Sequence, residues 1–297
     1  MTDLPADFKA YLSEHFDFNL PIIKDTYPAQ DGAIKFLLEL NNKTHIEMVL
    51  MPEGDKQTLC LSSQAGCKRQ CSFCATGSLG FIRNLTPEEI VAQVILAGQY
   101  LQDKHLTNLV FMGMGEPLDN LEHVLSAIKI IQSDYALQFS PRRITLSTCG
   151  IIPQIYALTQ SGIRVKLAVS LNSAIPEKRS ALMPINRIYP LDELKKAIQQ
   201  FRSISPWRVT FEYIMIPEIN LGEADALALI TFLGDISCKL NLIAWNPVAD
   251  APWRSPTEQE ALAFQSRLRH LPIAVTIRKS RGSDVNAACG QLALKNK

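Results

Sequence analysis

From residue 58 onward, short apolar runs alternate with longer segments in which apolar residues recur at helical spacing. The apolar runs predict strands near residues 58–62, 107–112, 143–147, 165–170, 208–215, 239–244 and 274–277. The segments between them predict helices that begin at Thr86 and that cover residues 120–133, 191–203, 222–234 and 257–270. Strands alternating with helices indicate parallel βαβ units, and the six units seen are fewer than the eight of a closed barrel. The pattern therefore predicts an α/β protein with an open, partial barrel.

The N-terminal part of the chain has a different pattern. It predicts a short helix around residues 6–16 and then a proline-containing turn near residue 28. Residues 33–39 and 45–51 are apolar or alternate, with a polar turn between them, which is typical of a β-hairpin. We therefore divide the chain into a helix-and-hairpin extension (1–52), a core (53–284) and a C-terminal segment (285–297).

Composition narrows the class of protein. The 297 residues, 47% hydrophobic and 20% charged, suit one large globular core. A formal net charge of +1 gives no global electrostatic reason to expect a polyanionic partner. Seven cysteines, an odd number, without an apolar N-terminal segment, argue against secretion and predict a reducing, cytoplasmic compartment. No apolar run is long enough to predict a membrane span.

Three closely spaced cysteines, Cys67, Cys71 and Cys74, form the pattern C-x3-C-x2-C. Three thiolates on one loop can hold three irons of a 4Fe–4S cluster and leave the fourth iron open for chemistry. The alternative is a structural zinc site, for which Cys60 could supply a fourth ligand. No second C-x2-C or H-x3-H follows, so the spacing favours the iron–sulfur cluster.

Small and polar residues follow the predicted strands at their carboxyl ends, where ligands bind in such sheets. Gly115 and Glu116 follow the second strand, where glycine lets a backbone edge approach a ligand and the carboxylate could pair with an ammonium group. The other candidate residues at these strand ends are Ser147, Ser170, Asn172 and Asn246, together with Leu171 between the second and third of them. Each alone is more often a turn or a helix cap. Together they predict one ligand-binding mouth.

A lone cysteine near the C-terminus, Cys289, follows a basic segment that contains Arg278 and Arg281. Positive surroundings lower the pKa of a thiol and favour the nucleophilic thiolate. Cys149 and Cys238 lie in apolar contexts, which predicts that they are buried packing residues. We therefore treat Cys289 as a candidate nucleophile.

Seven motifs occur in order between about residues 30 and 293: TLCLSSQAGC, CSFCATG, FIRNLTPEEI, MGMGEPLDN, RRITLST, NLIAWNP and IRKSRGSDVNAACGQLA. Together they resemble the radical S-adenosylmethionine (SAM) enzymes that methylate adenosine C2 in 23S ribosomal RNA, and their relatives that methylate C8. The resemblance implies a partial (βα)6 barrel in which SAM binds the open iron. It also implies that the residues at the predicted mouth, from Gly115 to Asn246, contact SAM.

The resemblance further implies a mechanism that uses two SAM molecules per turnover. Cys289 would accept a methyl group from the first SAM, and a radical derived from the second would activate that methyl group for addition to adenine C2. Cys60 would then attack the sulfur of Cys289, which releases the RNA and leaves a transient Cys60–Cys289 disulfide. Glu47 would accept a proton, with its pKa raised by an apolar neighbourhood. The alternative for Glu47 is a solvated strand residue.

Expected partners follow from the same resemblance: 23S ribosomal RNA, with transfer RNA as a second substrate, and a reductant such as flavodoxin, acting on a monomeric protein. A basic rim at the mouth would bind RNA, made of Lys68, Arg69, Arg83, Arg142, Arg143, Arg278, Lys279 and Arg281. The alternative is a solvated scatter of charges. Shorter ends than the family pattern, without its helical accessory domain and basic tail, predict weaker binding to RNA.

Rival functions are a related enzyme that modifies another RNA or adenine C8, and a non-catalytic iron–sulfur or zinc protein that binds RNA. Pure binding has no need for Cys60, Cys289 and Glu47, which argues against the non-catalytic rival. Asn172 stands where the family usually has histidine, and Ala244 where it has proline, so an amide replaces an imidazole at one of the predicted SAM contacts.

Overall fold

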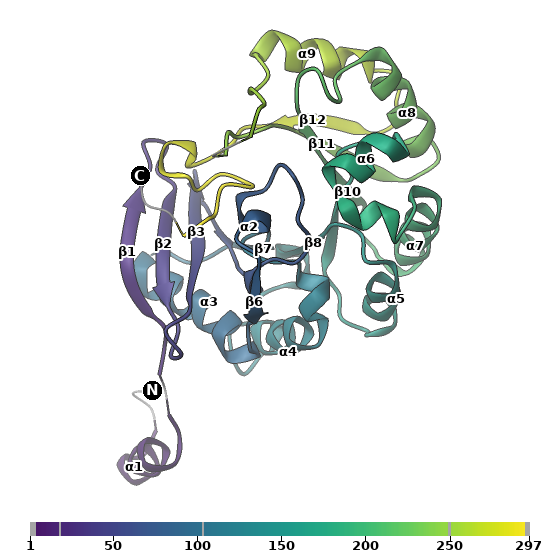
Figure 1. Ribbon diagram of the computed structural model, residues 1–297. Helices are drawn as coiled ribbons and strands as arrows, with labels where there is room; N and C mark the ends of the chain where they lie inside the picture. Colours follow the sequence, from purple (N-terminus) through teal and green to yellow (C-terminus); the bar gives the residue numbers. More distant parts are fainter. Residues whose placement is uncertain (1–3, 18, 103, 249–250, 295–297) are drawn as a thin grey trace.

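A single ten-stranded sheet organises the protein (Figure 1). The computed structural model describes residues 4–17, 19–102, 104–248 and 251–294. The strands that follow one another in parallel are β4 (Lys56–Cys60), β7 (Asn108–Phe111), β8 (Ile144–Thr148), β9 (Lys166–Ser170), β10 (Val209–Met215), β11 (Cys238–Ala244) and β12 (Ala274–Arg278). The sheet curls into an incomplete ring, so the predicted partial barrel is confirmed.

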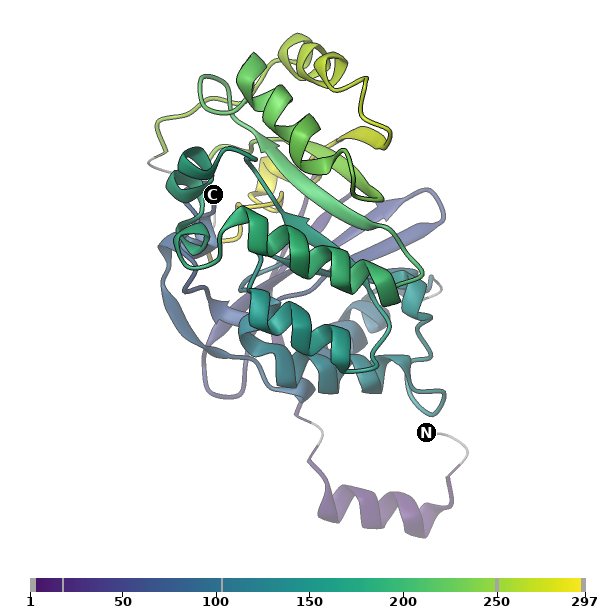
Figure 2. The same cartoon turned by 90° about the vertical axis from the view of Figure 1, so that its right-hand side faces the viewer.

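Helices cover the outer face of this ring (Figures 1 and 2). They are α3 (Pro87–Leu101), α4 (Leu121–Gln132), α5 (Ile152–Gln160), α6 (Pro176–Leu182), α7 (Leu191–Ile204), α8 (Glu223–Leu233) and α9 (Glu258–Arg267). Their apolar faces pack on the strands, with Ile128, Ile155 and Leu229 fully buried. The start of α3 follows its sequence signal, because Thr86 and Glu89 form a reciprocal capping box. None of the helices in the described residues is long and apolar enough to cross a bilayer.

Three antiparallel strands extend the sheet at its N-terminal edge: β1 (Ile22–Pro28), β2 (Ile34–Glu39) and β3 (His45–Glu53). The hairpin of β2 and β3 is confirmed, but the sequence did not predict β1. This strand is mostly exposed and lies at the edge of the sheet, where a proline is tolerated, so its apolar signal is weak. Because β3 pairs with β4, the sheet runs from the hairpin into the barrel without a break. The helix α1 (Ala6–His15) buries no side chain and stands apart from the body (Figure 2).

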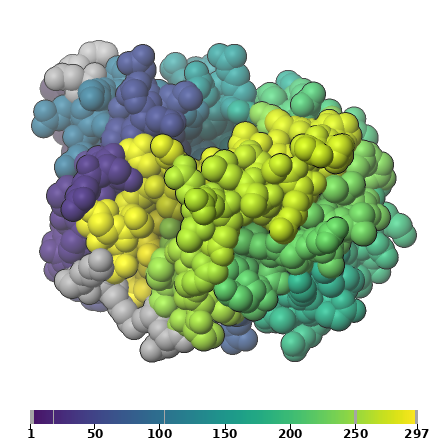
Figure 3. All heavy atoms as spheres, turned by 90° about the horizontal axis from the view of Figure 1, so that it is seen from above, coloured from purple at the N-terminus to yellow at the C-terminus, as the bar shows by residue number. Residues whose placement is uncertain are grey.

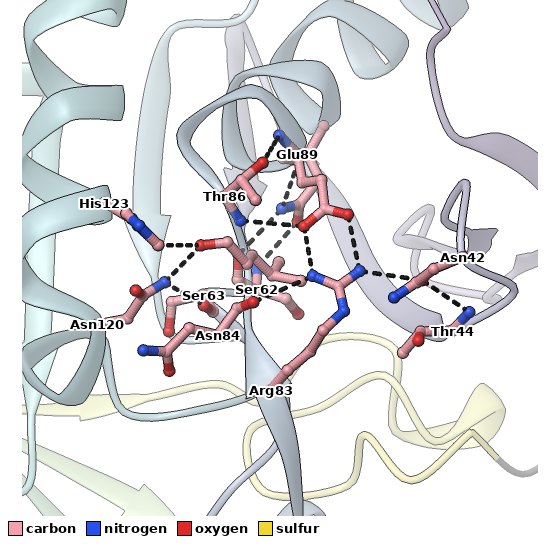
Figure 4. Close-up of polar contacts among 12 residues, drawn as sticks. Asn42, Thr44, Ser62, Ser63, Arg83, Asn84, Thr86, Glu89, Asn120 and His123 are labelled. Carbon is pink, nitrogen blue, oxygen red and sulfur yellow. Dashed lines mark hydrogen bonds and ion pairs between the residues drawn. The ribbon is translucent and has the colours of Figure 1, made fainter.

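The three-cysteine loop is framed by a small second sheet of β5 (Gln64–Gly66) and β6 (Phe81–Asn84), with the short helix α2 (Ala75–Ser78) between them. Polar contacts fix this sheet to the first turn of α3 and to the start of α4 (Figure 4). Arg83 donates two hydrogen bonds of 2.7 Å to Glu89 and one of 3.0 Å to Asn42. The Asn120 amide donates to the carbonyls of Ser63 and Leu85, both at 2.8 Å. The loop that carries the cysteines therefore rests on a rigid base.

Candidate functional site

One cavity of about 150 Å³ lies at the carboxyl ends of the parallel strands and is lined by Cys67, Cys71 and Cys74. All three thiols are free. Burial raises the pKa of Cys67 to about 12, and burial likewise raises the pKa values of Cys71 and Cys74. The thiols are therefore neutral on their own and would become thiolates when a metal centre binds them.

The donor set decides between one metal ion and a cluster. Among the described residues, no three histidine, cysteine or carboxylate side chains converge closely enough to hold a single metal ion. A 4Fe–4S cluster does not require the three sulfurs to converge on one point, because each cysteine binds a different iron. The three cysteines fit a cluster better than a zinc ion.

Two glycines that follow β7, Gly113 and Gly115, also line this cavity. Gly115 has a φ of +98°, and a Cβ there would lie 2.5 Å from Cβ of Gln64. A Cβ on Gly113 would lie 2.6 Å from the carbonyl oxygen of Leu61. Only glycine lets this edge of the backbone pass so close to the neighbouring strand.

Glu116 follows the glycines and points its carboxylate into the protein. It accepts hydrogen bonds from the backbone N–H groups of Cys149 at 2.8 Å and Leu118 at 3.0 Å. Burial raises the pKa of Glu116, and these hydrogen bonds oppose that effect. Gly115 and Glu116 both line the cysteine cavity, as a SAM contact would require.

The other predicted SAM contacts divide into two groups. Ser147, Ser170 and Asn172 line the cysteine cavity, whereas Leu171 and Asn246 are not among its lining residues. Asn172 has a φ of +57°, which asparagine tolerates better than most residues, and its Oδ1 accepts the N–H of Ile214 at 2.9 Å. The amide of Asn172 thus ties the end of β9 to β10. The SAM contacts themselves stay predictions.

Arg179 is a structural residue that the sequence did not reveal. It is 1% exposed and donates to the carbonyls of Cys149 at 2.8 Å and Leu171 at 3.1 Å. Burial lowers the pKa of Arg179 to about 10. The sequence predicted no helix over α6 and no role for this arginine. Cys149 is buried as predicted, but it also lines the cavity, which was missed.

The C-terminal segment places Cys289 beside the cysteine loop. In Figure 1 this yellow segment and α2 lie within the ring of strands, and Figure 3 shows yellow residues against the purple N-terminal strands. The carbonyl of Cys289 accepts a hydrogen bond from Asn246 Nδ2 at 3.1 Å, and the carbonyl of Gly290 accepts one from Ala75 at 2.7 Å. Asn246 therefore positions the candidate nucleophile.

Cys289 and Cys60 line a second cavity of about 60 Å³, and Cys289 also lines the first. Burial raises the pKa of Cys60 to about 12; the charge of Cys289 adds to this effect and that of Arg278 opposes it. The negative charge of Cys289 is in turn the largest influence that raises the pKa of Arg278. The guanidinium of Arg278 thus lies near both thiols.

Glu47 is 1% exposed, so the alternative of a solvated strand residue is wrong. Its surroundings are also not apolar, because Oε1 lies 3.0 Å from the Lys35 ammonium. Its Oε2 accepts the N–H groups of Ala293 at 2.9 Å and Leu294 at 3.2 Å. Glu47 lines neither cavity and instead anchors the C-terminal segment.

The predicted basic rim is wrong as a single surface. Arg69 is paired with Asp119, Arg83 with Glu89, and Arg281 with Asp31. Arg142 and Arg143 precede β8 and so lie at the opposite end of the barrel. Arg278 points into the interior, where it lines both cavities.

Comparison with known proteins identifies the family. The sequence matches the radical SAM superfamily over residues 61–230. It is 45% identical over 307 residues to the dual-specificity RNA methyltransferase RlmN of Desulfotalea psychrophila, covering 99% of this chain and 83% of that protein. For the RlmN of Syntrophobacter fumaroxidans the identity is 44% over 292 residues, covering 98% and 85%.

A solved structure gives the same result. A radical SAM methyltransferase from Sphaerobacter thermophilus superposes with a TM-score of 0.95 at 40% identity, covering 99% of this chain and 87% of that one. The likeness therefore includes the three-cysteine loop, the strand ends and the segment of Cys289 together. The chain belongs to the radical SAM superfamily and, within it, to the RlmN family of SAM-dependent RNA methyltransferases.

Proposed function

We propose that this RNA methyltransferase acts on C2 of an adenosine in 23S ribosomal RNA, with transfer RNA as a second substrate, through a methyl group carried by Cys289. The observation that supports this most is the position of Cys289, which lines both the cysteine cavity and the cavity of Cys60. A methyl group on this sulfur would lie between the proposed SAM site and the proposed resolving thiol.

The superfamily implies a 4Fe–4S cluster and SAM as cofactors. Cys67, Cys71 and Cys74 would hold the cluster, which when bound supplies the electron for reductive cleavage of SAM. The chain's own contribution is a site for the methionine end of SAM. The exposed backbone edge at Gly115 and the carboxylate of Glu116 suit its ammonium group, because both border the cavity.

Two cysteines would carry the group transfer. The Cys289 thiolate would displace the methyl group of one SAM, a nucleophilic step at a sulfur that lines the same two cavities as the Arg278 guanidinium. After the carbon has joined the base, the Cys60 thiolate would attack the Cys289 sulfur. The bond from that sulfur to the transferred carbon breaks, its electron pair stays with the carbon, and a proton completes the methyl group of the freed RNA. A transient Cys60–Cys289 disulfide would remain, for a reductant to open. Both thiols are free in the structure, as the start of such a cycle requires.

Proton acceptance by Glu47 stays a prediction. In the structure its carboxylate holds Lys35 and the backbone of Ala293 and Leu294. To take a proton from the substrate, Glu47 would have to exchange one of these bonds, and loss of its bonds to Ala293 and Leu294 would also release the C-terminal segment. The cytoplasmic location, the flavodoxin-class reductant, the monomeric state and the division of the chain at residues 52 and 284 are likewise part of this proposal.

The test is methylation by the reconstituted enzyme, with SAM deuterated in its methyl group and separate 23S ribosomal RNA and transfer RNA substrates. Mass spectrometry of the digested RNA should show 2-methyladenosine whose methyl group has lost part of its deuterium, because a hydrogen is removed on Cys289. A product methylated at C8 would establish the alternative regiospecificity. Tight RNA binding without any methylation by the cluster-loaded protein would favour the non-catalytic rival.

A further inference from the structure

The barrel is also open at the end where its strands begin. A hollow of about 660 Å³, here called the basin, is lined by Val110, Met112, Thr145, Lys166, Ala168, Pro206, Trp207, Arg208, Thr210, Glu212, Lys239, Asn241 and Arg278. Barrels of parallel strands normally fill this space with bulky branched side chains. Here most of the inward positions are small, polar or cationic, with Val110 and Met112 as exceptions, and the interior remains accessible.

The basin leads toward the cysteine cavity. Along β9 the inward residues are Lys166 and Ala168 in the basin and then Ser170 in the cavity, at the two-residue period of a strand. Three residues, Met112, Glu212 and Arg278, line both hollows. Since Arg278 also lies beside Cys289, a molecule that enters the basin can approach the reacting sulfur from below.

At the entrance of the basin, the positive charges outnumber the negative ones. Lys166, Arg208 and Lys239 make no ion pair with any described residue, and Glu212 is the carboxylate among the basin's lining residues. After burial, the nearby charges of Lys239, Arg143 and Arg142 lower the pKa of Lys166, which shows how closely these cations are gathered. Such a concentration of charge is stabilised by a polyanion.

An aromatic side chain stands at the same entrance. Trp207 is half-buried, and the guanidinium of Arg164 lies 5.7 Å from the centre of its ring. Indole and guanidinium planes are the surfaces on which unstacked RNA bases are held. The entrance therefore combines phosphate-binding and base-stacking groups, which favours single-stranded RNA over a protein partner.

Deeper in the barrel, one polar atom has no partner. Glu212 is 7% exposed, and its Oε1 accepts a hydrogen bond from Asn241 at 3.1 Å. Its Oε2 is buried and accepts no hydrogen bond from any described residue. A buried carboxylate oxygen left in this state costs free energy, which a donor on an incoming ligand would recover. The exocyclic amino group of adenine is such a donor.

We propose that the target nucleoside leaves the RNA stack and enters through the basin, where Glu212 accepts a hydrogen bond from the amino group of its base. Lys166, Arg208 and Lys239 bind the phosphates around it. This inference rests on the proposed function and assigns the entry side and the base contact. An enzyme that modifies a base must take that base out of the stack, and the basin provides the space for it.

The first test measures RNA binding by the holoenzyme to a single-stranded 23S ribosomal RNA fragment across salt concentrations. The double variant Lys166→Gln with Lys239→Gln should bind about tenfold more weakly, and the slope of log affinity against log salt should fall by about 1.4, or about 0.7 for each lost contact. The control is Lys129→Gln with Lys196→Gln, which removes the same charge from exposed positions on α4 and α7. Equal affinity and slope for both double variants would overturn the entry side.

The second test compares RNA carrying adenosine with RNA carrying purine riboside, which lacks the amino group, at the target position. Wild-type enzyme should discriminate between them in kcat/KM, and Glu212→Gln should lose at least tenfold of that discrimination while its affinity for SAM is unchanged. Unchanged discrimination, or a large loss of SAM affinity, would overturn the role of Glu212. If wild-type enzyme methylates neither RNA, the proposed function itself fails, a result distinct from these.

Discussion

The Lys35 ammonium and the Glu47 carboxylate form a buried ion pair, 3.0 Å apart, with both side chains almost fully shielded from water. The pair lies on the hairpin of β2 and β3, yet the same carboxylate accepts two backbone N–H groups of the C-terminal segment. Because Cys289 precedes those N–H groups by only a few residues, the ion pair links the N-terminal extension to the position of the candidate nucleophile.

Removal of the lysine should therefore disturb both stability and the segment. Lys35→Met leaves a buried charge without its partner, and breaking such a pair costs about 3–5 kcal/mol. Denaturant unfolding should show this loss, and hydrogen exchange should become faster in residues 288–294. Lys43→Met is the matched control, because its pair with Glu39 is exposed on the lysine side and should contribute at most about 1 kcal/mol. Similar losses in both variants would contradict the anchoring role.

Alanine variants of Cys289 and Cys60 should block the reaction at different steps. Cys289→Ala should abolish methyl transfer to protein and RNA while SAM still binds, since the acceptor sulfur is gone. Cys60→Ala should allow the adduct with RNA to form but not to be resolved, so crosslinked protein accumulates on denaturing gels. Cys238→Ala, which removes a buried thiol that lines neither cavity, should turn over normally. Normal turnover by the Cys60 variant would show that another group resolves the adduct.

The sequence predicted what depends on local pattern. The alternation of strands and helices, the capping box of Thr86 and Glu89, and the hairpin turn are set by neighbouring residues, and each is confirmed. The cysteine spacing and the glycines after β7 likewise put the cavity at the correct end of the sheet. These signals are short-range, so the chain order alone reveals them.

Contacts between residues that are distant in sequence could not be predicted in this way. The sequence left Arg69 and Arg83 as candidate RNA contacts, although folding brings Asp119 and Glu89 to them. Arg179 is buried by carbonyls that come from two other strand ends. Arg142 precedes a parallel strand, and a residue in that position lies at the end of the sheet opposite the ligand site, so its place in the chain already excludes it from the mouth. The basin is lined by residues of several strands, so the sequence of any single strand could not predict it.

Stability should depend on pH through the buried thiols. Burial raises the pKa of Cys238 to about 12, so the folded protein keeps this thiol neutral while the unfolded chain releases the proton near pH 9. The stabilising effect is complete below pH 8 and is lost as pH rises from about 9 to 12, by about 1.4 kcal/mol per pH unit. Chemical unfolding of Cys238→Ala between pH 7 and 10 should therefore show a shallower decline than wild type. Ser237→Ala should keep the wild-type slope, and an unchanged slope in the Cys238 variant would contradict this linkage.

Replacement of Gly115 by alanine tests whether the backbone edge beside the cavity needs a residue without a side chain. At Gly115 a methyl group would meet Cβ of Gln64 at 2.5 Å and its backbone nitrogen at 2.9 Å, at a φ of +98° that alanine rarely adopts. Gly115→Ala should push the backbone edge away from the cavity, lower the melting temperature and weaken SAM binding at least tenfold by calorimetry. Gly98→Ala is the opposite case, because Gly98 lies in α3 with nothing within 4 Å of the added Cβ. That variant should gain about 0.5–1 kcal/mol of stability and bind SAM as wild type does. If both variants bound SAM equally well, the edge at Gly115 would not form part of the SAM site.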